Sequence, residues 1–178
     1  MRLSGASGNL VTIADATING VTVGRGGGNI ATNVILSSTS LQSNTTGFQN
    51  TALGTSAMQN NTTGNRNTAI GAYSLRANTT GIWNTAIGEE ALYANTTGGS
   101  NTANGFGVLS NNTSGGGNTA NGVYALLYNL TGNDNSANGG GALQYNTTGN
   151  NNTANGAGSL GRNTTGGQNA ANGYMALN

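Results

Sequence analysis

A tetrapeptide, Asn-Thr-Thr-Gly or a close variant, recurs along this chain every 17 residues without a single insertion. Cutting at each copy gives seven complete units and an eighth that ends one residue short. A unit this short buries little surface alone and becomes stable by stacking on its neighbours. The period therefore predicts an array. The units begin at Asn44, Asn61, Asn78, Asn95, Asn112, Asn129, Asn146 and Asn163.

Counted from that first Asn, some positions of the unit are fixed and others vary. Positions four and eleven are always Gly, and position nine is always Ala. Positions five, six, twelve, thirteen, sixteen and seventeen vary freely, as residues on a surface do. Position seven is always Asn, at Asn50, Asn67, Asn84, Asn101, Asn118, Asn135, Asn152 and Asn169. Position fifteen forms a core stripe of Met58, Leu75, Leu92, Leu109, Leu126, Leu143, Leu160 and Leu177.

The unit is too short for a helical hairpin, and its regular Gly and Asn residues weaken helices. It is long enough for one coil of a β-solenoid or β-roll, so we predict an all-β fold. We expect a strand at positions seven to ten and a second strand at positions fourteen to seventeen. Gly at position eleven and the Asn-Thr-Thr-Gly segment would form the corners, because Gly and Asn tolerate positive φ.

Stacked coils bring equivalent side chains together at intervals of about 4.8 Å. The Asn residues at positions one and seven are then predicted to form ladders of side-chain amide hydrogen bonds. Position ten is apolar in the first three units and Asn in the last five. We expect it to point inward, where the Asn residues must find partners, and keep the outward orientation open. This polar ladder comprises Asn104, Asn121, Asn138, Asn155 and Asn172.

The apolar content of each coil is small. One Leu and two Ala, at about 25 cal/mol per Å² of buried apolar surface, contribute little against an ordering cost of about 1–2 kcal/mol per residue. We therefore expect several chains to share the Leu stripe along a common axis. A homotrimer is the symmetric solution that we favour.

Residues 1–26 differ from the array and are expected to form short strands and a connection. Alternating apolar residues predict strands at Leu10–Ile13 and Ala16–Val23, with a turn at Asn19–Gly20. The following Gly-Arg-Gly-Gly-Gly segment, 24–28, is not followed by the Gly-Lys-Ser/Thr of a phosphate-binding loop. We predict a tight connection into the array there.

Residues 27–43 fit the repeat in a degenerate form, and residues 44–178 contain the eight regular units. Asn33 falls at position seven and Leu41 at position fifteen. Terminal repeats are atypical because one face has no neighbour, so residues 27–43 are predicted to be a capping repeat. Regular sequence continues to Asn178, where we expect further coils or a neighbouring molecule to cover the stack.

Composition argues against several classes of function. Five Arg, no Lys and four acidic residues provide no basic stripe, so we expect no nucleic-acid partner. The chain has neither Cys nor His, so we expect no metal site and no cofactor. Only Glu89 and Glu90 are neighbouring carboxylates, which does not suggest a catalytic pair, and we expect no enzymatic activity. The sequence lacks the apolar run of about 18 residues that a membrane span needs.

The surface offers candidates for one modification and for two kinds of ligand. The Asn at the start of each of the eight units is a candidate acceptor of N-glycosylation. We favour the alternative that the corner of the coil requires Asn for its own structure. Rows of Thr at positions two, three and eight raise the hypothesis of ice binding, but their spacing predicts that few share a face. Exposed aromatic residues could contact host-surface carbohydrate. These are Phe48, Tyr73, Trp83, Tyr93 and Phe106.

Part of the sequence resembles repeat-bearing tail-fibre proteins of bacteriophages. The resemblance lies in the Asn-Thr-Ala-Ile-Gly segments at 67–71 and 84–88, in the Ser74-Leu75 and Ala91-Leu92 pairs that follow them, and in the lead-in 18–29. The same core is similar to the head repeats of trimeric autotransporter adhesins, which are left-handed β-rolls. The resemblance implies a trimeric fibre, located in a virion or outside the cell.

We therefore expect a structural fibre protein, either a rigid shaft or a surface-attachment segment of a phage tail fibre or bacterial adhesin. One alternative is a subunit, with or without glycans, that polymerises end to end into an extracellular filament. Another is an ice- or carbohydrate-binding solenoid. The expected partners are further copies of the chain and host-surface carbohydrate. We expect no association with a membrane.

Overall fold

The computed structural model describes residues 16–18 and 21–178. The strand predicted at Leu10–Ile13 and the turn predicted at Asn19–Gly20 lie outside the described residues. One short 3₁₀ turn, Gly27–Asn29, precedes the array. The strands are β1 Ala16–Ile18, β2 Val21–Gly24, β3 Val34–Leu36, β4 Thr51–Leu53, β5 Thr68–Ile70, β6 Thr85–Ile87, β7 Thr102–Asn104, β8 Thr119–Asn121, β9 Ser136–Asn138, β10 Thr153–Asn155 and β11 Ala170–Asn172.

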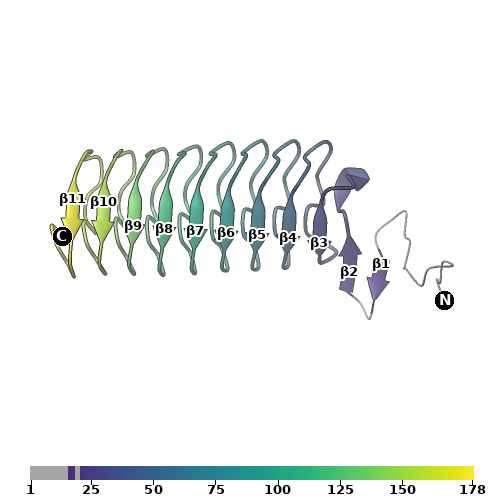
Figure 1. Ribbon diagram of the computed structural model, residues 1–178, viewed down its shortest axis with the longest axis horizontal. Coiled ribbons are helices and arrows are strands. Elements are labelled where there is room, and N and C mark those ends of the chain that lie inside the picture. The colour runs from purple at the N-terminus through teal and green to yellow at the C-terminus, as the bar shows by residue number, and fades with distance from the viewer. Residues whose placement is uncertain (1–15, 19–20) are drawn as a thin grey trace.

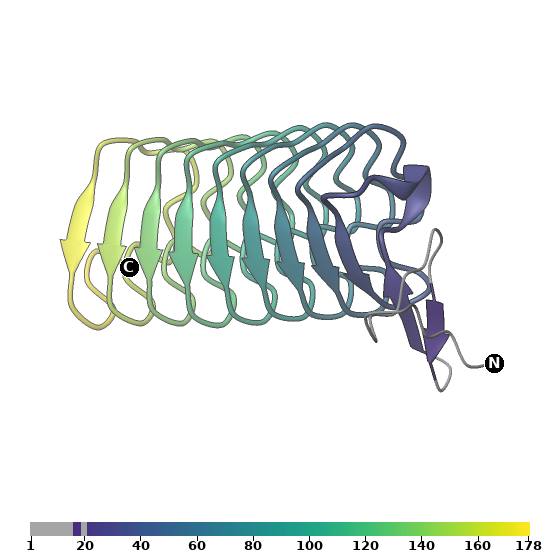
Figure 2. The same cartoon turned by 45° about the vertical axis from the view of Figure 1, so that its right-hand side comes forward.

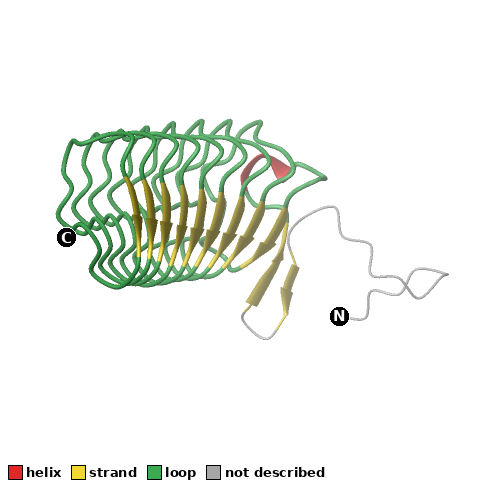
Figure 3. Ribbon diagram, turned by 60° about the vertical axis from the view of Figure 1, so that its left-hand side comes forward, coloured by secondary structure: helices red, strands yellow, loops and turns green. Residues whose placement is uncertain are grey.

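The array is a β-solenoid with one strand in each 17-residue coil (Figure 1). Strands β3 to β11 lie side by side as one parallel sheet, and loops close the rest of each coil (Figures 2 and 3). Each pairing joins residues 17 apart in the sequence, as where Thr85 lies beside Thr102 and Ala86 beside Ala103. The predicted solenoid fold and its period are confirmed.

The second strand predicted at positions fourteen to seventeen is wrong, because this part of every coil is a series of turns. Its Leu residues adopt left-handed backbone conformations, with φ of 49° at Leu75 and 53° at Leu92. Such φ values are costly for a residue with a side chain. Hydrogen bonds between coils compensate: Leu75 N donates to Ala91 O at 2.9 Å, and Ala77 N donates to Tyr93 O at 3.0 Å. Neighbouring coils are thus bonded in their turns as well as in their strands.

The core lies inside a single chain. Ala at position nine and Leu or Met at position fifteen belong to one buried cluster. The stripe from Met58 to Leu143 has no exposed surface, whereas Leu177 in the last coil is 68% exposed. The expectation that sister chains complete this stripe is therefore wrong, because the turns at positions twelve to seventeen fold over it.

A hairpin and a glycine-rich turn cover the N-terminal end of the stack. Strand β2 pairs antiparallel with β3 on one side and with β1 on the other. Gly27 N donates to Leu41 O at 2.8 Å, and a side chain at Gly27 would collide with the backbone of Gln42 and Asn44. The predicted capping repeat, residues 27–43, is therefore the first coil of the stack, and the open edge of its strand β3 is covered by β2.

Across the residues that the structure describes, no helix has the length and apolarity needed to span a membrane.

Candidate functional site

The Asn at position seven braces each coil against both of its neighbours. Asn101 is representative: its backbone N donates to Asn84 Oδ1 at 3.0 Å, and its Nδ2 donates to the same oxygen at 3.1 Å. Its Nδ2 also donates to Gly115 O in the next coil at 2.9 Å. The same three bonds recur at Asn67, Asn84, Asn118, Asn135 and Asn152.

The Asn at position one forms a second buried ladder. Asn95 Nδ2 donates to Asn78 Oδ1 at 2.8 Å and to Gly98 O of its own coil at 3.0 Å. From Asn61 to Asn146 these residues have no exposed surface. The nitrogen that a glycan would modify therefore lies inside the solenoid with both hydrogens in use. This burial agrees with the favoured interpretation that the corner itself needs Asn and argues against glycosylation at position one. Seven of these Asn residues are buried, and the eighth, Asn163, is half-buried in the last coil.

The sequence holds three further acceptor patterns, of which two lie on the surface. In the third, Asn111-Asn112-Thr113, Asn111 is half-buried and its Nδ2 donates to Leu127 O at 2.9 Å. Asn60-Asn61-Thr62 and Asn151-Asn152-Thr153 both fit the acceptor pattern, and Asn60 and Asn151 are exposed. We expect the folded protein from a glycosylating host to carry any N-glycan on these two residues and none on Asn61 or Asn95. Peptide mass spectrometry of the monodisperse, folded fraction measures this. A glycan on Asn95 in that fraction would contradict the buried ladder.

Position ten points outward, so the inward polar ladder that we favoured is wrong. In every strand from β4 to β11 the Ala at position nine is the buried residue. Because side chains alternate along a strand, positions eight and ten must both face solvent. The Asn residues still form a ladder, on the outside. Nδ2 donates to the next Oδ1 at 2.8 Å from Asn121 to Asn138, at 2.9 Å from Asn138 to Asn155 and at 2.8 Å from Asn155 to Asn172.

We call the outward residues at positions eight and ten of β4 to β11 the sheet face. Position eight contributes Thr in six of these strands, Ser136 in β9 and Ala170 in β11. The expectation that few Thr share a face is therefore wrong for position eight. The sheet face changes along the stack: its position-ten rank is Leu53, Ile70 and Ile87 in β4 to β6, and Asn from Asn104 onward.

The exposed aromatic residues join coils to one another. The Arg66 guanidinium lies 5.6 Å from the Phe48 ring centre and 5.7 Å from that of Trp83. Arg76 lies 5.8 Å from the ring centre of Tyr73 in its own coil and 5.7 Å from that of Tyr93 in the next coil. Arg76 Nη1 also donates to the Tyr93 hydroxyl at 2.7 Å. These contacts between neighbouring coils stabilise the stack.

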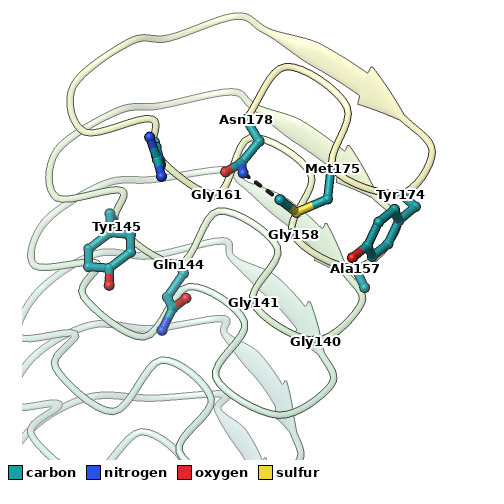
Figure 4. Close-up of a pocket in the computed structure, with 11 residues that line it drawn as sticks. Gly140, Gly141, Gln144, Tyr145, Ala157, Gly158, Gly161, Tyr174, Met175 and Asn178 are labelled. Atoms are coloured by element: carbon teal, nitrogen blue, oxygen red, sulfur yellow. Dashed lines mark hydrogen bonds between the residues drawn. The ribbon is translucent and has the colours of Figure 1, made fainter.

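A groove of about 370 Å³ crosses the last three coils (Figure 4). Small residues form its floor, namely Gly140, Gly141, Ala157, Gly158 and Gly161. Tyr145 and Tyr174 line it together with Gln144, Arg162 and Asn178, and Tyr145 is held by stacking on Tyr128 at 5.2 Å between ring centres. Aromatic rings beside amide and guanidinium donors suit a sugar, whose faces are apolar and whose edges are hydroxyls. The aromatic residues predicted from the sequence to contact carbohydrate do not include the two that line this groove.

Within the described part of the chain, no three His, Cys, Asp or Glu side chains gather as metal ligands would. Comparison of the chain with models of protein families, with curated proteins and with solved structures finds no match.

Proposed function

We propose that this chain is a structural protein that forms a rigid shaft or surface-attachment segment of an extracellular fibre, such as a phage tail fibre or a bacterial adhesin. The observation that carries the proposal is the unbroken set of hydrogen bonds between coils. Strands, turns and both buried Asn ladders contribute to it. With about 4.8 Å per coil, the eight regular repeats extend roughly 40 Å. A rod bonded around its whole circumference resists bending.

The proposal includes association into a homotrimer, now through the outer surface. The position-ten rank of the sheet face is apolar at its N-terminal end, where Ile70 is 38% and Ile87 40% exposed. Val34 and Leu36 of β3, which are 53% and 45% exposed, extend this patch. Exposed apolar patches on a regular surface favour association. Three rods packed along this patch would form a thicker shaft.

A filament that grows end to end is less well supported. Polymerisation of that kind needs an open parallel edge at the N-terminal end for the last coil of a neighbour. Strand β2 already occupies that edge by pairing with β3. The shaft therefore fits the geometry better than the filament.

The groove supports the attachment role, with host-surface carbohydrate as the ligand class. Tyr145 and Tyr174 would stack on sugar rings, and Arg162 would bind hydroxyl or acidic groups. A glycan array probed with the whole chain and with the Tyr145→Ala variant tests this role. Binding that the variant loses supports attachment, and a chain that binds no glycan serves as shaft alone.

Electron microscopy combined with light scattering tests the shaft. Discrete, straight rods with the mass of three chains support it. Fibres that lengthen with protein concentration would instead favour the filament, and flexible or collapsed particles would contradict both.

A further inference from the structure

The polar half of the sheet face carries two parallel ranks of hydrogen-bonding side chains. The hydroxyl rank is Thr102, Thr119, Ser136 and Thr153, and the amide rank is Asn104, Asn121, Asn138 and Asn155. We propose that this half of the sheet face binds the surface of ice. This activity is additional to the proposed shaft and requires that the polar half stay uncovered where chains associate through the apolar half.

The spacing of these groups is that of a lattice. Strands β7 to β10 pair in unbroken 17-residue register, so each rank repeats once per coil, at about 4.8 Å. Within a strand the two ranks are two residues apart, which is about 6.7 Å. The chain thus presents a nearly rectangular grid of donors and acceptors. A crystal of water has hydrogen-bonding groups that repeat along its surface, whereas liquid water has none that stay in place.

The grid is held in place before any ligand binds. Each Asn from Asn121 to Asn155 donates one amide hydrogen to the next Asn, which fixes the orientation of the side chain. The second amide hydrogen of Asn121 and of Asn155 still faces solvent, whereas that of Asn138 is donated to Ser136 Oγ at 3.4 Å and so links the two ranks. The β-branched Thr side chains have restricted χ1 angles. Little side-chain entropy is lost when such a surface orders a layer of water.

The chemistry of the two ranks favours ice over other flat ligands. Neither rank contains a charged residue, and charged groups would hold water in their own hydration geometry. Neither contains an aromatic ring, the group that stacks on the sugar faces of a polysaccharide. Thr contributes a methyl group as well as a hydroxyl, so the surface combines hydrogen bonding with apolar contact. The apolar rank in β4 to β6 lacks the amide partners, which confines the proposed site to the C-terminal half.

Thermal hysteresis and inhibition of ice recrystallisation test the inference, using the complete chain. Thr119 lies near the middle of the hydroxyl rank, and Thr119→Tyr would place a bulky ring above the grid without touching the core. The matched control is Thr148→Tyr, which changes an exposed Thr at an Asn-Thr-Thr-Gly corner outside the sheet face. Circular dichroism and the thermal midpoint verify that both variants fold.

We expect the wild-type chain and Thr148→Tyr to show the same hysteresis, and Thr119→Tyr to lose most of it. The inference is overturned if the folded wild-type chain shows no hysteresis, or if the two variants are equally active. It is also overturned if light scattering shows that Thr119→Tyr only dissociates an oligomer, because the polar ranks would then contact another copy. Rods seen by microscopy but without hysteresis would reject ice binding and leave the shaft intact.

Discussion

Replacing Asn101 with Leu is expected to lower the free energy of unfolding by about 3 kcal/mol, since it deprives two buried donors of an acceptor at about 1–3 kcal/mol each. Those donors are the backbone N and the Nδ2 of Asn118, which bond to Asn101 Oδ1 at 3.0 and 3.1 Å. Leu is larger than Asn, so no cavity forms, and overpacking of this fully buried site adds to the loss. Urea unfolding followed by circular dichroism measures the change.

The matched control lies three residues away in the same coil. Asn104→Leu changes an exposed residue of the sheet face. Leu already occupies the equivalent position in an earlier coil, at Leu53. We expect its stability to lie within about 0.5 kcal/mol of the wild type. Equal stability of Asn101→Leu and Asn104→Leu would show that the buried amides do not hold the coils together.

The second large effect is expected from Gly132→Ala, which should destabilise the chain by about 3 kcal/mol through overpacking. A methyl group at Gly132 would come within 2.8 Å of Asn146 Nδ2 and 2.5 Å of Gly149 O, and would also press on Asn129 Oδ1. These atoms belong to the position-one ladder, so the coils would have to separate. The thermal midpoint and urea midpoint of the variant should both fall.

Gly140→Ala is the control in the same coil. The nearest atom to a methyl group there is Val123 O at 3.7 Å, an ordinary contact. Ala72 and Ala157 already occupy the equivalent position in other coils. We expect a change within about 0.5 kcal/mol. If Gly132→Ala were as stable as Gly140→Ala, the close approach of the coils at position four would be refuted.

The period alone was enough to predict the solenoid and its register. Because no insertion interrupts the 17-residue interval, only stacking in register places every Ala of position nine at the same depth. Ala86 beside Ala103 and Ala120 beside Ala137 show this in the structure. The repeat likewise places equivalent Asn residues one above another.

The turns at positions twelve to seventeen could not be predicted, because the residues that adopt positive φ are not the ones that favour it. Leu109 has φ of 52° and Tyr124 of 60°. Local preference for these residues is extended or right-handed helical. The hydrogen bonds that coils exchange in the turns override that preference, and they exist only in the stacked array.

The direction of position ten follows from the strand itself, because Ala at position nine points inward and side chains alternate. The turns decide how the core is enclosed. With two strands per coil, a Leu at position fifteen would lack an enclosed site, and an inward position ten or a sister chain could fill the gap. The observed turns enclose Leu109 completely within one chain. The turns thus account for the buried core stripe, and the inward Ala103 accounts for the outward Asn104.

Distances between spin labels along the sheet face test most directly whether residues 17 apart lie one above the next. The chain has no Cys, so cysteines introduced at Leu53 and Asn138, or at Leu53 and Asn172, carry the only labels. These pairs are separated by five and seven coils, which corresponds to about 24 and 34 Å at 4.8 Å per coil. We expect two narrow distributions whose means differ by about two coil spacings, or 10 Å. Broad distributions, or means that do not increase with the number of coils, would contradict the stacked solenoid.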